Sequence, residues 1–319
     1  MDRIQRSWEL FKSSLFVMKQ NKTLLAFPIL TSILTIMLVV LFLVPVAFRP
    51  TGHSYASAQH WKAVTAGIVD LDTQSPAQGD ASNPSFHRGV RFGRNVKPIA
   101  AVYFAAMYFA CMFLATFLNV AFYHEIMNAL SGQPVSIAEG LSFAARKWKI
   151  ILMWTLFAGL VGFIIKTLEE RFGWFGEIIM RLIGTVWSIA CVFVIPVIIT
   201  EEGTSNPLVV LKKSAQTLTR TWGESLIGYA GVSLSSSVIM GISLVWLIGG
   251  LAAASFLHSI LLAVFVVLSW LGALIVFSYL MSVASQIFRC ALFLYASQGT
   301  LPHPYNEEMM SLAWKTKKS

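Results

Sequence analysis

Six long apolar runs constrain this chain more than any other feature of its sequence. The hydrocarbon core of a bilayer is about 30 Å thick, and an α-helix crosses it with roughly 20 apolar residues. Runs near this length occupy residues 24–48, 99–123, 150–165, 178–199, 226–248 and 258–281. Only 12% of the residues are charged and the mean hydropathy is +0.68, so a bilayer is the expected solvent. The sequence therefore predicts six transmembrane helices.

The spans follow one another along the whole chain, and no large polar region stands apart from them. We therefore expect an all-α, polytopic helical membrane protein whose residues 1–319 form a single membrane domain. The one long connection, residues 49–98, is rich in Ala, Ser, Gly and Pro, which predicts a flexible loop outside the cytoplasm. Its histidines and aspartates fit no metal-ligand spacing, so they are interpreted as solvated loop residues: His53, His60, Asp70, Asp72 and Asp80.

Basic residues are distributed unevenly between the two sides that six spans would create. Of the 24 Lys and Arg residues, fifteen lie before the first span, in the second and fourth connections, or after the last span. The remaining nine include a local cluster at residues 88–97 on the opposite side. Cytoplasmic segments carry the excess of Lys and Arg, so both termini are predicted to be cytoplasmic.

Three short segments with helical periodicity precede the first, third and fifth spans. Each would form a cytoplasmic amphipathic helix before a transmembrane hairpin, so the architecture would repeat three times. Ser136 and Glu139 predict a capping box for the second helix, and Asn206 before Pro207 predicts the N-cap of the third. The apolar faces comprise Ile4, Trp8, Phe11, Leu15 and Met18; Ile137, Leu141, Ala144 and Trp148; and Leu208, Leu211, Ala215, Leu218 and Trp222.

Two interpretations of these amphipathic helices remain open. They are either ordinary connectors packed on the protein or helices that lie in the inner-leaflet interface. In the second case their basic side chains are candidates for contact with anionic lipid headgroups. These candidates are Lys12, Lys19, Arg146, Lys147, Lys149, Lys212, Lys213 and Arg220.

Ionisable residues are almost absent from the centres of the spans, which argues against a proton relay. A mixed-charge cluster lies between the third and fourth spans, and we favour an ion-pair network that closes the hairpin over a polar ligand site. Its members are Lys166, Glu169, Glu170, Arg171, Glu177 and Arg181. His124 and Glu125 are adjacent on a helix and should not face one another, so no catalytic role is assigned to them.

The fifth span carries small residues at a four-residue spacing, namely Ser233, Ser237 and Gly241. Such a stripe lets two helix backbones approach closely, and tight helix packing is the favoured interpretation. A polar track through Ser235 and Ser236 is the alternative.

Four segments carry a resemblance to a known family: IQRSWELFKSSLFVMKQNKTLLAFPIL, GTVWSIACVFVIPVIITEEG, LKKSAQTLTRTWGE and IFRCALFLYASQG. They resemble a bacterial family of six-pass membrane proteins known only as a domain of unknown function. The stretch from Pro196 to Glu201, with the helix after it, is also similar to the membrane domain of glycerophosphodiester phosphodiesterases. That similarity implies lipid association. The catalytic barrel of those enzymes has no counterpart here, so no hydrolase activity is implied.

Together these features predict a non-catalytic integral membrane protein that associates with lipids or acts as a scaffold. The alternative is a channel or transporter for a small or lipidic solute, with a path along the fifth span and the mixed-charge cluster. No catalytic motif or cofactor motif is present, and the basic residues form no separate nucleic-acid-binding module. The expected partners are anionic membrane lipids, and a protein partner or a second copy of the chain is a further candidate.

Overall fold

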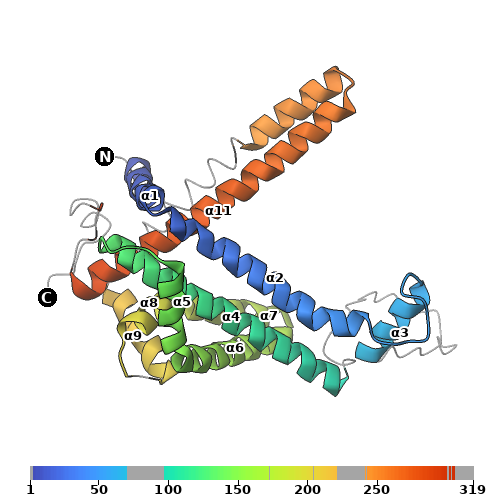
Figure 1. The fold of residues 1–319 in the computed structure, drawn as a ribbon, viewed down its shortest axis with the longest axis horizontal. Coiled ribbons are helices and arrows are strands. Elements are labelled where there is room, and N and C mark those ends of the chain that lie inside the picture. Colours follow the sequence, from blue (N-terminus) through green and yellow to red (C-terminus); the bar gives the residue numbers. More distant parts are fainter. Residues whose placement is uncertain are drawn as a thin grey trace. The chain divides into compact units, whose positions relative to one another are not determined.

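The computed structural model describes residues 3–69, 97–171, 173–203, 205–220, 241, 243–299, 302, 304 and 305. This part of the chain is helical and contains no strand, which confirms the all-α prediction (Figure 1). The long apolar helices are α2 (Ala26–Ala47), α4 (Pro98–Leu130), α6 (Trp148–Arg171), α7 (Gly173–Ala190) and α11 (Ile260–Gln298), and the short apolar helix α8 (Val194–Thr200) follows α7.

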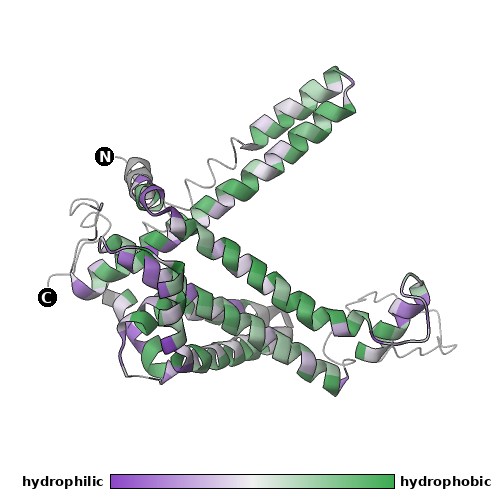
Figure 2. Ribbon diagram, viewed as in Figure 1, coloured by the Kyte–Doolittle hydropathy of each residue, from purple (hydrophilic) through white to green (hydrophobic). Residues whose placement is uncertain are grey.

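Within the described residues, five helical stretches are long and apolar enough to cross a membrane. They are Lys22–Ala47, Pro98–Leu130, Trp148–Glu169, Ile178–Thr200 and Ile260–Gln298, and they coincide with five of the six predicted spans. The remaining predicted span, residues 226–248, lies largely outside the described residues, and the apolar helix Ser243–Phe256 begins near its end. Figure 2 shows hydrophobic residues along most of α2 and α11. Six spans in three hairpins therefore remain a prediction.

Helices form in all three predicted segments: α1 (Arg3–Gln20), α5 (Ile137–Arg146) and α9 (Pro207–Arg220). The prediction is wrong for Trp148, which begins α6 instead of ending the second short helix. The N-cap of α9 is confirmed, because the backbone N–H of Leu208 donates to Asn206 Oδ1 at 2.9 Å. Each helix buries one face within the protein. The buried residues are Ser13, Ser14, Val17 and Met18 on α1, Gly140 and Ala144 on α5, and Val210, Ser214 and Leu218 on α9.

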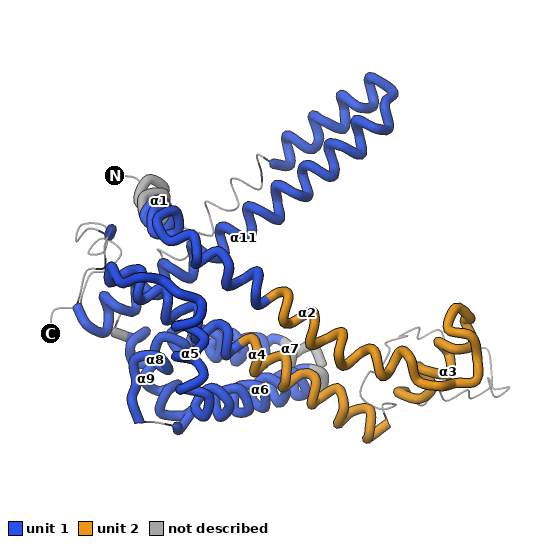
Figure 3. Tube along the Cα trace, viewed as in Figure 1, with its two compact units in different colours: residues 1–31, 116–319 blue, residues 32–115 orange. Residues whose placement is uncertain are grey.

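The helices form two compact units, residues 32–115 and the remainder of the chain (Figure 3). The smaller unit contains most of α2, the first part of α4, and α3 (Ala58–Ile68). Here α2 and α4 meet through an edge contact between Phe42 and Tyr103, whose ring centroids are 5.6 Å apart. The hydroxyl of Tyr103 donates to the Phe42 carbonyl at 2.6 Å.

The expectation of a solvated loop is wrong for the beginning of residues 49–98, because α3 forms there. His60 is fully buried, with Nδ1 2.6 Å from Thr51 Oγ1 and Nε2 2.9 Å from the Ala47 carbonyl. Its ring also contacts Tyr55 and Trp61. His60 therefore ties α3 to the end of α2. Asp70, Asp72 and Asp80 lie outside the described residues.

In the larger unit, Glu125 fixes the start of α5 against α4. Its Oε2 accepts the backbone N–H of Ser136 at 2.7 Å, and the carboxylate is fully buried. The predicted capping box is therefore wrong: the Ser136 side chain makes no capping hydrogen bond, and Glu125 occupies the position expected of Glu139. Gly140 allows this approach, because a Cβ there would lie 2.9 Å from the Ala121 carbonyl oxygen and from Glu125 Cγ.

A break between α7 and α8 interrupts the predicted fourth span. Ser214 of α9 satisfies both sides of it: its hydroxyl donates to the Ala190 carbonyl at 2.6 Å and accepts the backbone N–H of Phe193 at 3.1 Å. Pro196 lies in the first turn of α8, where a missing N–H costs no helical hydrogen bond. In the preceding hairpin of α6 and α7, Trp154 stacks on Trp187 at 6.2 Å.

Two hydrogen bonds join segments that are far apart in the sequence: one joins α1 to residue 305, and the other joins α11 to residue 25 before α2. Ser14 Oγ and Tyr305 Oη are 2.8 Å apart and both residues are buried. Burial raises the pKa of Tyr305 well above its usual range, although the hydrogen bond with Ser14 lowers it. The hydroxyl of Tyr279 on α11 donates to the Leu25 carbonyl. Gly299, in the left-handed conformation at φ 65°, ends α11.

Gly140→Ala should destabilise the protein, because the added methyl group would collide with α4 backbone and with a buried carboxylate. We expect a loss of about 1–3 kcal/mol, as for other overpacked sites. Gly272→Ala is the matched control, because it also adds a methyl group within a helix but meets no described atom within 4 Å. It should be neutral or stabilising. Thermal unfolding in detergent measures both, and equal melting temperatures would contradict the α4–α5 contact.

Candidate functional site

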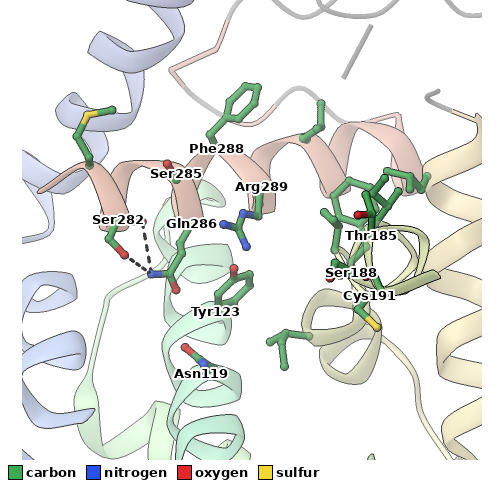
Figure 4. A pocket seen from close by; sticks show the side chains of 18 of the residues that line it. Asn119, Tyr123, Thr185, Ser188, Cys191, Ser282, Ser285, Gln286, Phe288 and Arg289 are labelled. Carbon is green, nitrogen blue, oxygen red and sulfur yellow. Dashed lines mark hydrogen bonds between the residues drawn. The ribbon is translucent and has the colours of Figure 1, made fainter. Parts of the chain in front are cut away.

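A large groove lies within the larger unit, between α4, α6, α7, α8, α9 and α11. Its volume is about 1180 Å³. Figure 4 shows ten labelled side chains that line it. The polar and charged lining residues are Asn119, Tyr123, Glu169, Arg181, Thr185, Ser188, Ser278, Ser282, Ser285, Gln286 and Arg289.

Helix α11 contributes a polar row to the groove. Ser278, Ser282, Ser285 and Arg289 are spaced four, three and four residues apart, which places them on one helix face. Gln286 lies beside this row, and its side-chain nitrogen donates to the carbonyl and hydroxyl of Ser282, both at 3.4 Å. In Figure 4 the side chains of Gln286 and Arg289 extend from α11 toward Tyr123 of α4. The row extends about 16 Å along the helix at 1.5 Å per residue.

Helix α7 contributes the opposite wall with a similar periodicity. Arg181, Thr185 and Ser188 lie along one face, and Gly184 between them packs toward Ile165 of α6. The hydroxyls of Thr185 and Ser188 each donate to a carbonyl of their own helix at 2.8 Å. Their remaining capacity is therefore that of hydrogen-bond acceptors.

The rest of the lining is apolar. The break after α7 brings Cys191, Val192 and Phe193 to the groove, and α8 adds Ile195. The other apolar lining residues are Ile165, Met180, Ile189, Leu218, Met281, Phe288 and Leu292. Polar groups concentrated on two helices and apolar groups around them suit an amphiphile, a molecule with a polar head and an apolar tail.

The groove contains no recognisable catalytic constellation or metal centre among the described residues. No group of three or more His, Cys, Asp or Glu side chains in this part of the chain could hold a metal ion. What the lining offers chemically is hydrogen bonding and charge.

The mixed-charge cluster contributes two members to the groove, Glu169 and Arg181. The side chain of Lys166 is exposed, and those of Glu170, Arg171 and Glu177 lie outside the described part of the structure. An ion-pair network between α6 and α7 therefore remains a prediction.

His124 and Glu125 differ from expectation, because their side chains meet. His124 Nδ1 lies 3.1 Å from Glu125 Oε1, and Asn128 donates to the same oxygen at 3.4 Å. The His124 ring stacks on Phe143 of α5 at 3.9 Å. These contacts anchor α5 on α4, and we assign them a structural role.

The basic residues of the amphipathic helices divide into two sets. Lys147 donates to the Glu201 carbonyl, and Lys213 forms an ion pair with the Glu201 carboxylate at 2.5 Å. Arg146 is exposed and donates to Ser142 at 3.0 Å. The other described candidates have exposed side chains: Lys12, Lys19, Lys149 and Lys212. The Arg220 side chain lies outside the described residues.

The structure describes one of the three residues that form the predicted packing stripe of the fifth span, Gly241. Ser233 and Ser237, like Ser235 and Ser236, lie outside the described residues. Gly241 is helical and exposed, and a Cβ there would meet no described atom within 4 Å. Close packing at this stripe therefore stays a prediction.

Sequence reasoning missed the polar row of α11 because the predicted sixth span ended at residue 281. The helix continues to Gln298, and the row crosses that predicted end. The signal was present as polar residues at positions 278, 282, 285 and 289, at helical spacing within a largely apolar helix. The row becomes visible once the helix is extended past Met281.

Comparison with known proteins places the chain in a family without assigning an activity. No curated protein and no solved structure matches it significantly. Residues 99–302, more than half of the chain, match a family of unknown function, DUF6159. This range includes the groove-lining residues and the helices that hold them. The chain therefore belongs to the DUF6159 family of unknown function.

Proposed function

We propose that this protein is a non-catalytic integral membrane protein that binds a membrane lipid in the groove of the larger unit. One observation carries the proposal: a groove of about 1180 Å³ in which polar residues of α11 and α7 are flanked by apolar residues of α6, of the break after α7 and of α8. Pockets for drug-sized ligands usually measure about 300–1,000 Å³, so this groove suits a larger ligand. The similarity of residues 196–201 and the helix after them to membrane domains of glycerophosphodiester phosphodiesterases also supports lipid binding.

The proposed topology has six spans in three hairpins, with both termini in the cytoplasm of a bacterial inner membrane. Each hairpin follows one of the helices α1, α5 and α9. The distribution of Lys and Arg supports this arrangement. It would place the three short helices at the inner leaflet.

The exposed surfaces of the three helices support contact with that leaflet. Each helix buries one face in the protein, and an apolar side chain remains exposed beside basic residues on α1, on α9 and at the start of α6, directly after α5. The exposed fractions are 44% for Phe16, 49% for Trp148 and 58% for Leu208. Phe16 follows Lys12 by four residues, and Leu208 precedes Lys212 by four, so each pair lies on one helix face. Such pairs suit an interface in which apolar groups enter the bilayer and cations contact phosphates.

A second candidate function is transport of a lipidic solute. The length of the polar row on α11 favours it, because a headgroup could move along successive serines while the tail stays in an apolar environment. Binding and transport predict the same ligand and differ in whether the lipid changes leaflet.

The topology predicts the location of two reporter fusions. A fusion after Ser75 should be active as a periplasmic reporter, and one after Ser319 as a cytoplasmic reporter. Paired alkaline phosphatase and fluorescent protein fusions measure this. A cytoplasmic signal at Ser75 would overturn the topology and remove the short helices from the inner leaflet.

Replacing exposed cations should weaken association with anionic lipid more than replacing cations bound to Glu201. Lys149→Gln with Lys212→Gln removes two exposed charges, worth roughly 2 kcal/mol together near an anionic surface. Lys147→Gln with Lys213→Gln removes the same charge but alters cations that already contact Glu201. Native mass spectrometry at low salt measures the loosely bound phosphatidylglycerol of each double variant. Equal losses would mean that total charge, and not an exposed interface, controls lipid contact.

Filling the groove should remove a firmly held lipid. Ser285→Trp places a large side chain in the polar row, whereas Gly272→Trp adds one to α11 where no described atom lies within 4 Å. We expect the first variant to lose most of the lipid that survives a detergent wash and the second to keep it. Lipid extraction and mass spectrometry measure the retained amount.

Equal retention by Ser285→Trp, Gly272→Trp and the parent protein would reject the groove as the binding site. The same proteins in liposomes separate the two candidate functions. If the parent exposes a fluorescent inner-leaflet lipid to an impermeant quencher and Ser285→Trp does not, transport replaces binding as the function.

A further inference from the structure

Among the described residues that line the groove, arginines outnumber carboxylates. Two arginines and one glutamate line it, and among the described lining residues Glu169 is the single acid. Glu169 and Arg181 come from α6 and α7, which join one another directly. Arg289 comes from α11 and extends toward Tyr123 together with Gln286 (Figure 4). In this part of the groove a guanidinium therefore lies beside polar side chains.

The hydroxyl groups on the α7 wall donate no proton to an anionic ligand. Thr185 and Ser188 use their protons within α7, so they offer oxygen lone pairs to a ligand. A guanidinium presents N–H donors in a planar fork that matches two oxygens of a phosphate. Arg289 is thus the residue best suited to an anionic group in this region.

In a membrane, the headgroup and not the acyl chain should determine which lipid the groove binds. An acyl chain gains little hydrophobic energy by moving from bilayer hydrocarbon into an apolar groove, because both environments are apolar. Selectivity must then come from polar contacts that bulk lipid lacks. The polar contacts available here lie along α11 and around Tyr123.

The depth of these residues suits a headgroup. Tyr123 is the last residue of the predicted second span, and Arg289 lies two helical turns past residue 281, the predicted end of the sixth. In the proposed topology both ends are on the cytoplasmic side. Arg289 and Tyr123 would therefore lie near the phosphate level of the inner leaflet.

We propose that the groove selects a phospholipid with a net anionic headgroup and that Arg289 binds its phosphate. The inference rests on the proposed lipid binding in the groove. A zwitterionic headgroup would bring its ammonium group close to Arg289, where no described lining carboxylate other than Glu169 could offset it. An anionic headgroup avoids this repulsion.

The test compares Arg289→Gln with Arg289→Lys and with Lys62→Gln, which removes one exposed charge on α3, outside the set of groove-lining residues. Each protein is equilibrated in nanodiscs with equal phosphatidylglycerol and phosphatidylcholine, then washed in detergent, and the firmly retained lipid is identified by mass spectrometry. Arg289→Gln should reduce the preference for phosphatidylglycerol roughly tenfold, the effect of losing one charged hydrogen bond. Arg289→Lys should restore part of it, and Lys62→Gln should leave it unchanged.

Several outcomes would overturn the inference. If the parent protein retains phosphatidylglycerol and phosphatidylcholine in the same ratio as the nanodisc, the inference is wrong. This result needs no variant, so the inference can be tested even if Arg289→Gln fails to fold. An unchanged preference in folded Arg289→Gln would overturn the inference as well. Displacement of the lipid by glycerol 3-phosphate would show that the site takes a soluble phosphate ester.

The failure of this inference can be distinguished from failure of the proposed function. If Ser285→Trp empties the groove but Arg289→Gln keeps the preference, lipid binding stands and the headgroup assignment falls. If Ser285→Trp retains the lipid, the groove is not the site and both fall.

Discussion

The hydrogen bonds of Ser214 across the break between α7 and α8 are the interaction on which the groove depends. A helix interrupted at membrane depth leaves carbonyl and N–H groups that bilayer hydrocarbon cannot satisfy. Ser214 satisfies one of each, at Ala190 and at Phe193. The break turns the chain so that residues 191–193 line the groove. The same two bonds hold α9 against the spans, so one side chain supports both the groove and a short amphipathic helix.

Glu125 plays the corresponding part for α5. A buried carboxylate is costly unless hydrogen bonds satisfy it, and here the Ser136 N–H, Asn128 and His124 surround it. Gly140 lets α5 approach close enough for the first of these bonds. The short helices are thus attached to the spans by buried polar contacts. Their attachment to the protein leaves the opposite faces exposed, so packing and membrane contact do not exclude one another.

Five spans and the three short helices could be predicted because their signals are local. Apolar length, helical periodicity and the Asn206 N-cap each lie within a few turns of chain. The contact of Glu125 with Ser136 could not be predicted in this way, because Glu125 lies eleven residues before Ser136. Glu139, three residues after Ser136, was the expected local partner. His60 was missed for a similar reason: its partners, Thr51 and Ala47, come from the end of α2 and the turn that follows it. Composition correctly indicated a connection there but could not reveal that a buried imidazole organises it.

The groove shows why a predicted transmembrane helix should be examined past the end of its apolar run. A window of about 20 apolar residues ends a span where polar residues begin, and it therefore excludes residues that a helix carries to the headgroup level. In α11 the helical hydrogen bonding continues through Ser282, Ser285 and Arg289, and these residues share the groove face with Ser278. Polar residues at the end of a span are tolerated because the interface is wet. Where they also line a groove, the same tolerance allows a binding site for a molecule that is itself half polar and half apolar.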